Sequence, residues 1–265
     1  MTTELSYDRA GPGGRTPVVL LHAGVADRRM WDPQWPALTA DRDTVRLDLR
    51  GFGQSDQRPT GPLHPAQDVL DALAALGIDR CHLVGASFGA GVAVEVALAR
   101  PDLVRSLLLS APGGALLTDA TPDLRAFFAA ERAALADGDL DAAVEANLTW
   151  WLIGPDRGPD AVAQPIRELV GRMQRRAFEI TLDWDDVPEH DAGPPALDQL
   201  RTPTLVLLGG HDLDTIRLAA HRPAEQAPDA RLLSWPDVAH LPSVERPAEF
   251  TELLRDWLTA RDSAG

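Results

Sequence analysis

A serine stands at the centre of the stretch Gly85-Ala86-Ser87-Phe88-Gly89. The apolar run 81–84 before it predicts a buried strand, and residues 90–99 after it predict a helix. Glycines two positions before and after the serine would let the strand and the helix approach closely, with the hydroxyl projecting at the turn. The start of the helix would add unpaired N–H groups, which favour a negatively charged oxygen. This context predicts that Ser87 is a catalytic nucleophile; a glycine-rich turn that happens to contain serine is the alternative.

A serine hydroxyl needs a base that takes its proton. Of the seven histidines, His240 follows the last predicted strand and precedes the last predicted helix. In a parallel sheet that loop lies at the same edge as Ser87, so we predict that His240 is the base; a helix-start residue in a surface loop is the alternative. His22 also follows a strand, but there we expect the backbone to matter more than the side chain.

The base needs an acid to orient it, on a loop after a strand between the serine and the histidine. The sequence Gly209-Gly210-His211-Asp212-Leu213-Asp214 follows the predicted strand 203–208. We prefer Asp212 and hold Asp214 in reserve. Either carboxylate could instead cap the helix that begins there.

An oxyanion would need two backbone N–H donors. One should be Phe88, directly after the serine, and the other should be Val25, in the loop after the early strand 17–21. Gly24 would permit the tight turn of that loop and border the substrate. His22 and Gly24 could equally be turn residues without a catalytic part.

Apolar runs that predict strands alternate with stretches that predict helices, which indicates a mostly parallel sheet covered by helices on both faces. The predicted strands are 4–8, 17–21, 44–48, 81–84, 104–109, 203–208 and 230–234. The predicted helices of this alternating part are 28–38, 65–76, 90–99, 213–220 and 248–258.

Residues 113–195 break this alternation, because strand-like runs vanish and helix-forming residues dominate. We predict a helical lid over 113–195 and a core formed by 1–112 and 196–265. Trp150, Trp151 and Trp184 fall in the lid, and we expect at least one of them to line the substrate pocket. The lid arginines Arg167, Arg172, Arg175 and Arg176 could hold a substrate carboxylate, although a solvated helix face is the preferred interpretation.

Composition excludes several classes of function. The chain carries a net charge of −15 and no lysine, which disfavours nucleic acid and anionic membranes as partners and excludes lysine-based covalent chemistry. The single cysteine, Cys81, lies in an apolar run and is interpreted as a buried structural thiol in a reducing compartment. The histidines lack metal-ligand spacing, so neither a metal nor a cofactor is predicted. Without a signal pattern or a membrane span, we expect a cytoplasmic monomer or homodimer that acts on a small molecule.

Together, the serine motif, the order Ser87…Asp212…His240, His22-Ala23-Gly24 and the loop 48–55 resemble the α/β-hydrolase superfamily. The resemblance implies an eight-stranded sheet with one antiparallel strand and a helical lid after the sixth strand. It is strongest for small esterases, enol-lactone hydrolases and cofactor-free haloperoxidases, although Phe88 stands where many such lactonases carry Met. Serine rather than aspartate at position 87 disfavours the dehalogenase and epoxide-hydrolase branches.

The sequence therefore predicts a cofactor-independent serine hydrolase that cleaves a small carboxylic ester or lactone through an acyl-enzyme. The alternatives are a C–C bond hydrolase or perhydrolase with the same three residues, or a ligand-binding protein that retains the fold without catalysis.

Overall fold

Seven strands form one sheet in the computed structural model, which describes residues 5–118, 120–188, 190 and 193–263. The spatial order is β1-β3-β2-β4-β5-β6-β7; β1 pairs antiparallel with β3, and every other pairing is parallel. The strands are β1 (Tyr7–Ala10), β2 (Val18–Leu21), β3 (Thr44–Leu47), β4 (Cys81–Ala86), β5 (Val104–Ser110), β6 (Thr204–Gly209) and β7 (Ala230–Trp235).

The strand count corrects one expectation. Each of the seven predicted strands overlaps an observed strand, but the sheet of the described residues lacks the eighth strand that the resemblance implied. The helical insertion consequently follows β5, the fifth strand, and not a sixth.

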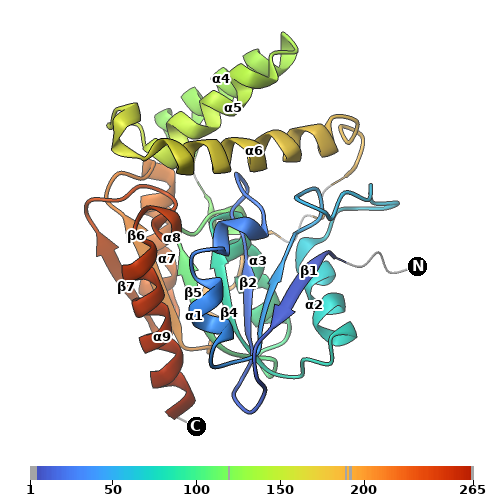
Figure 1. Cartoon of the computed structure of the whole chain (residues 1–265), viewed down its shortest axis with the longest axis vertical. Helices are drawn as coiled ribbons and strands as arrows, with labels where there is room; N and C mark the ends of the chain where they lie inside the picture. Colours follow the sequence, from blue (N-terminus) through green and yellow to red (C-terminus); the bar gives the residue numbers. More distant parts are fainter. Residues whose placement is uncertain (1–4, 119, 189, 191–192, 264–265) are drawn as a thin grey trace.

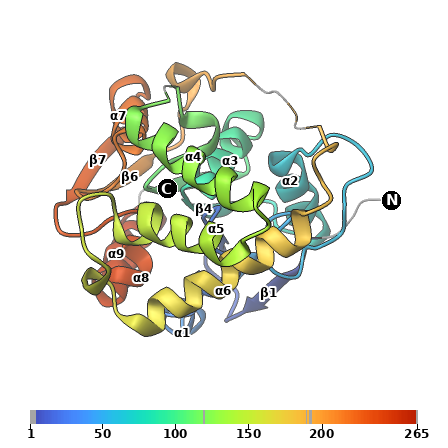
Figure 2. The same ribbon diagram turned by 90° about the horizontal axis from the view of Figure 1, so that it is seen from above.

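Helices cover both faces of this sheet. They are α1 (Trp35–Thr39), α2 (Pro65–Ala75), α3 (Phe88–Ala99), α4 (Pro122–Ala136), α5 (Leu140–Asn147), α6 (Gln164–Thr181), α7 (Asp214–Gln226), α8 (Pro242–Glu245) and α9 (Pro247–Ser263). Helices α1 and α9 lie on one face, whereas α2, α3 and α7 lie on the other (Figures 1 and 2). The strands β2, β4 and β6 are buried along their whole length, as expected for parallel strands between two helical layers.

The prediction of one continuous helix over 28–38 is wrong. The chain forms the 3₁₀ turn η1 (Arg28–Trp31) and, after it, the short helix α1. Pro33 accounts for the break, because it lacks the backbone N–H that a continuous helix would use there, whereas Pro36 lies in the first turn of α1, where proline is tolerated.

The segment between β5 and β6 contains only helical elements among its described residues. Helices α4, α5 and α6 lie across the end of the sheet at which the parallel strands terminate (Figure 1). The shorter elements of this segment are η2 (Gly114–Leu116), the π-helical turn η3 (Leu148–Ile153), η4 (Pro159–Ala161) and η5 (Leu197–Gln199).

Cys81 is buried at the start of β4, and burial raises the pKa of its thiol to about 12, as expected for an unreactive structural cysteine. No helix in the described ranges combines the length and the hydrophobicity that crossing a bilayer requires.

Candidate active site

Ser87 lies at a sharp turn between β4 and α3. Its backbone adopts φ 50° and ψ −114°, which is strained for a residue with a side chain. The flanking glycines are required by close packing: a Cβ on Gly85 would lie 2.3 Å from the Gly89 carbonyl oxygen, and one on Gly89 would lie 2.5 Å from the His22 carbonyl oxygen. Although Ser87 occupies the N-cap position of α3, its hydroxyl makes no capping hydrogen bond, so the oxygen is available for another partner.

That partner is His240, which the fold brings beside Ser87 from 153 residues away. The Ser87 Oγ lies 2.7 Å from His240 Nε2, and His240 Nδ1 lies 2.8 Å from Asp212 Oδ2. An ionised carboxylate can only accept, so the ring proton lies on Nδ1 and leaves Nε2 free to accept from the serine hydroxyl. The side chains of His240 and Asp212 are almost completely buried, which strengthens the interaction between them.

The structure separates the two candidate acids. Asp212 sits in the loop after β6, where its carboxylate bonds both His240 and the backbone N–H of Leu213. Asp214 is exposed at the first position of α7, and its backbone N–H donates to Asp123. Of the two, only Asp212 contacts the imidazole within the described residues.

The loop after β2 packs directly against the start of α3. Gly89 N–H donates to the His22 carbonyl oxygen at 3.2 Å, and a Cβ on Gly24 would lie 3.5 Å from the Phe88 Cβ. The backbone N–H groups of Val25 and Phe88 make no hydrogen bond to another described part of the chain. The two predicted oxyanion donors therefore belong to adjoining backbone segments and are unpaired there.

The side chain of His22 has a function that the sequence interpretation missed. The imidazole is fully buried: Nε2 accepts from the Leu49 N–H at 2.9 Å, and Nδ1 lies 2.9 Å from the Ala23 carbonyl oxygen. Burial lowers the pKa of His22, so the ring is held neutral with its proton on Nδ1. The side chain, and not only the backbone, thus joins the loop after β2 to the loop after β3.

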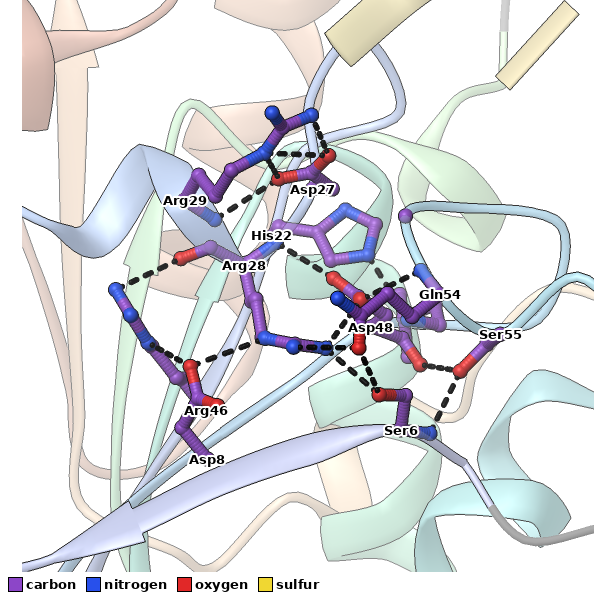
Figure 3. Close-up of polar contacts among 12 residues, drawn as sticks. Ser6, Asp8, His22, Asp27, Arg28, Arg29, Arg46, Asp48, Gln54 and Ser55 are labelled. Carbon is purple, nitrogen blue, oxygen red and sulfur yellow. Dashed lines mark hydrogen bonds and ion pairs between the residues drawn. The ribbon is translucent and has the colours of Figure 1, made fainter. Parts of the chain in front are cut away.

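The loop after β3 is itself held by the buried carboxylate of Asp48 (Figure 3). Asp48 accepts from the backbone and side chain of Arg28 and from the Gln54 N–H. A Cβ on Gly53 would lie 2.3 Å from Asp48 Oδ2, so only glycine fits beside the carboxylate. Arg28 lies three residues after Val25, so the Asp48 cluster also fixes the far end of the loop after β2, which carries the candidate oxyanion donor Val25.

The three predicted lid tryptophans have different surroundings. Trp151 packs its ring against His240, with centroids 4.7 Å apart, and edge-on against Phe127. Trp184 packs instead over Gly51, and Trp150 is half-buried against the hydrophobic core. Trp151 is therefore the tryptophan that the fold places at the candidate site.

The insertion arginines mostly pair with acids. Arg175 pairs with Asp141, Arg172 with Glu168, and Arg176 with Asp56. Arg167 lines a groove between α5 and α6. These pairings favour the interpretation of a solvated helix face over a carboxylate-binding role.

The described residues contain no group of three or more histidine, cysteine, aspartate or glutamate side chains that could hold a metal ion.

The buried neutral state of His22 predicts a pH dependence of stability. The pKa of this ring is lowered in the fold from an unfolded value of about 6.5, so acidification below that value protonates the unfolded chain first and lowers the free energy of unfolding. Burial lowers the pKa of His82 in the same direction. The His22→Gln variant should lose about 1–3 kcal/mol at neutral pH and show a shallower loss between pH 7.5 and 5.5. Urea unfolding at both pH values checks this; equal pH dependence in the two proteins would show that His22 is not held neutral.

Comparison with known proteins identifies the family. Residues 18–253 match the model of the alpha/beta hydrolase family. The chain is 28% identical over 262 residues to the "Putative carbamate hydrolase RutD" of Pseudomonas savastanoi pv. phaseolicola, with 92% of this chain and 95% of the relative covered. It is 26% identical to 3-oxoadipate enol-lactonase 1 of Acinetobacter baylyi, with 96% and 92% covered.

A solved structure agrees over the same extent. An N-acyl homoserine lactone degrading enzyme, Est816, matches with a TM-score of 0.74 and 27% identity, covering 95% of this chain and 96% of the other. Because the family model spans most of the sequence, the chain belongs to the alpha/beta hydrolase family, as its motifs indicate.

Proposed function

We propose that the protein is a cofactor-independent serine hydrolase that cleaves a small carboxylic ester or lactone. The observation that carries the proposal is the continuous hydrogen-bonded row Ser87–His240–Asp212, with Ser87 at a strained turn. Relatives named as an enol-lactonase and as a methyl ester esterase support this class of substrate.

In the proposed mechanism, Ser87 Oγ attacks the carbonyl carbon while His240 Nε2 takes the hydroxyl proton. The carbonyl oxygen becomes an oxyanion between the N–H groups of Phe88 and Val25, each worth about 3–4 kcal/mol of transition-state stabilisation. Collapse of the tetrahedral intermediate breaks the C–O bond, and His240 gives its proton to the leaving alkoxide. Water, activated by the same imidazole, then hydrolyses the acyl-enzyme and restores Ser87.

The surroundings of Ser87 favour an apolar, neutral substrate. A Cβ on Gly113 would lie 3.2 Å from Ser87 Oγ and 3.6 Å from the Ile216 side chain, and Trp151 packs on His240. The acid-paired insertion arginines offer no ready partner for a substrate carboxylate.

The proposal extends to the organisation of the chain. Residues 1–112 and 196–265 would form the catalytic core, and residues 113–195 would act as a lid that limits substrate size and excludes water. The position of α4, α5 and α6 across the strand ends supports this division (Figure 1).

Removal of the nucleophile tests the proposal directly. Ser87→Ala should lower kcat by about 10⁶ in an assay with p-nitrophenyl esters and lactones, as in other triads. A fluorophosphonate should label Ser87 of the wild-type protein, detected by peptide mass spectrometry. Near-normal turnover in the variant would refute the mechanism, and stoichiometric ligand binding without turnover would favour a binding protein.

The two acids provide a matched comparison. Asp212→Asn should lower kcat by about 10⁴, because the amide would stabilise the wrong imidazole tautomer. Asp214→Asn should leave kcat near the wild-type value, because Asp214 is exposed and makes no contact with His240. Both are measured on the same ester; the reverse ranking would transfer the orienting role to Asp214.

The tryptophans test the lid. Trp151→Ala should enlarge the pocket and shift the preference between short and long acyl chains. Trp184→Ala should lower stability by about 3–5 kcal/mol without such a shift, as expected for loss of a packed ring. An acyl-chain-length series and thermal unfolding of both variants decide this; an unchanged chain-length profile in Trp151→Ala would remove Trp151 from the pocket.

A further inference from the structure

A buried ion pair joins the helical insertion to the end of the core that carries His240. Arg157, in the turn after η3, donates from Nη2 to Glu245 Oε2 at 2.7 Å, and Glu245 is the last residue of α8. The two side chains are 11% and 7% exposed. A buried pair is tolerated only when its remaining donors and acceptors are also satisfied, so their other partners show what the pair holds in place.

Glu245 uses its second oxygen on the loop of the proposed base. Its Oε1 accepts from the Ala239 N–H at 2.8 Å, and Ala239 directly precedes His240. The carboxylate therefore fixes the backbone from which the imidazole projects.

Arg157 connects the same loop to the helix that carries Trp151. Its Nε donates to the Ile153 carbonyl oxygen at 2.5 Å, and its Nη1 donates to the Asp237 carbonyl oxygen at 3.2 Å. Ile153 ends η3, the π-helical turn that places Trp151 against the His240 ring. The Arg157 guanidinium thus links the loop that carries His240 to η3, the turn whose Trp151 packs on the His240 ring.

The turn also closes on the loop of the proposed acid. Gly154 has φ +97°, and a Cβ there would lie 2.5 Å from the carbonyl oxygen of His211. The His211 Nδ1 lies 3.1 Å from the Asp156 carboxylate. Residues 153–157 therefore contact both loops that carry the partners of Ser87.

We propose that Arg157 and Glu245 are positioning residues that hold His240 in line with Ser87, and that residues 153–157 are the part of the insertion that is fixed to the core. The inference rests on the proposed function, because it takes His240 as the base of Ser87. Proton transfer needs the imidazole at hydrogen-bond distance and in the correct orientation, and a displacement of about 1 Å can cost about 10²-fold in rate.

The test compares Arg157→Gln with Arg175→Gln. Both changes remove one arginine charge from the insertion, but Arg175 pairs with the exposed Asp141 on α5. We expect Arg157→Gln to lower kcat and the rate of inactivation by fluorophosphonate by about 10- to 100-fold, with KM changed by less than about 3-fold. Arg175→Gln should match the wild-type protein in all three quantities.

Glu245 supplies a second, more conservative variant should Arg157→Gln fail to fold. In Glu245→Gln one amide oxygen replaces only one of the two accepting carboxylate oxygens. The rate of inactivation by fluorophosphonate should therefore fall less in Glu245→Gln than in Glu245→Ala.

Chemical rescue provides a further test. Guanidinium ion at millimolar concentration should accelerate inactivation of Arg157→Ala and leave the inactivation rate of Arg175→Ala unchanged. All rates are measured well below the unfolding midpoint of the weakest variant.

A purely structural role gives a different result. Folded Arg157→Gln and Glu245→Gln proteins with lower unfolding midpoints but wild-type kcat and inactivation rate would overturn the inference. If the wild-type protein itself is not labelled at Ser87, the proposed function fails instead, so the two failures are distinguishable.

Discussion

The candidate site depends on a backbone contact closer than any side chain would allow. Gly85 and Gly89 bring β4, the start of α3 and the loop after β2 into direct contact, and Ser87 between them takes a strained conformation. A methyl group at either glycine would separate these segments. The separation would change the positions of the Ser87 hydroxyl and of both candidate oxyanion donors relative to one another, because all three are on the segments in contact.

The same physical device assembles the other two loops. A Cβ on Gly209 would lie 2.1 Å from the Ala239 carbonyl oxygen, and one on Gly210 would lie 2.3 Å from the Pro236 carbonyl oxygen. The loop of Asp212 and the loop of His240 are therefore pressed together at their backbones, and the His211 N–H donates to the Val238 carbonyl oxygen across that contact. Asp212 and His240, 28 residues apart, meet because these glycines leave no side chains between them.

The sequence allowed the parts of the site with local signals to be predicted. Ser87 was recognisable from its glycines and its strand–helix context, and Asp212 and His240 from their places after strands. The side-chain role of His22 was not recognisable, because its partner Leu49 lies in another loop and nothing near His22 indicates that contact. The pair Arg157–Glu245 spans 88 residues and joins the insertion to a four-residue helix that the sequence pattern does not predict. The eighth strand, which the described residues lack, has a different explanation, since that number came from the resemblance and not from the seven strands predicted along the sequence.

The two sides of Ser87 are supported in different ways, and this difference bears on how the insertion could act. The side with the candidate oxyanion donors is held mainly within the core, by His22 and by the Asp48 cluster with Arg28 (Figure 3), and the Asp27 N–H also donates to Met173 Sδ of α6. The side with His240 is held partly from the insertion, through Arg157 and the packing of Trp151. A rearrangement of the insertion that spared residues 153–157 would leave the contacts of His22, Asp48 and Arg157 in place and change mainly what covers the site. A rearrangement that included this turn would disturb the position of His240 and leave the core contacts of His22 and Asp48 in place.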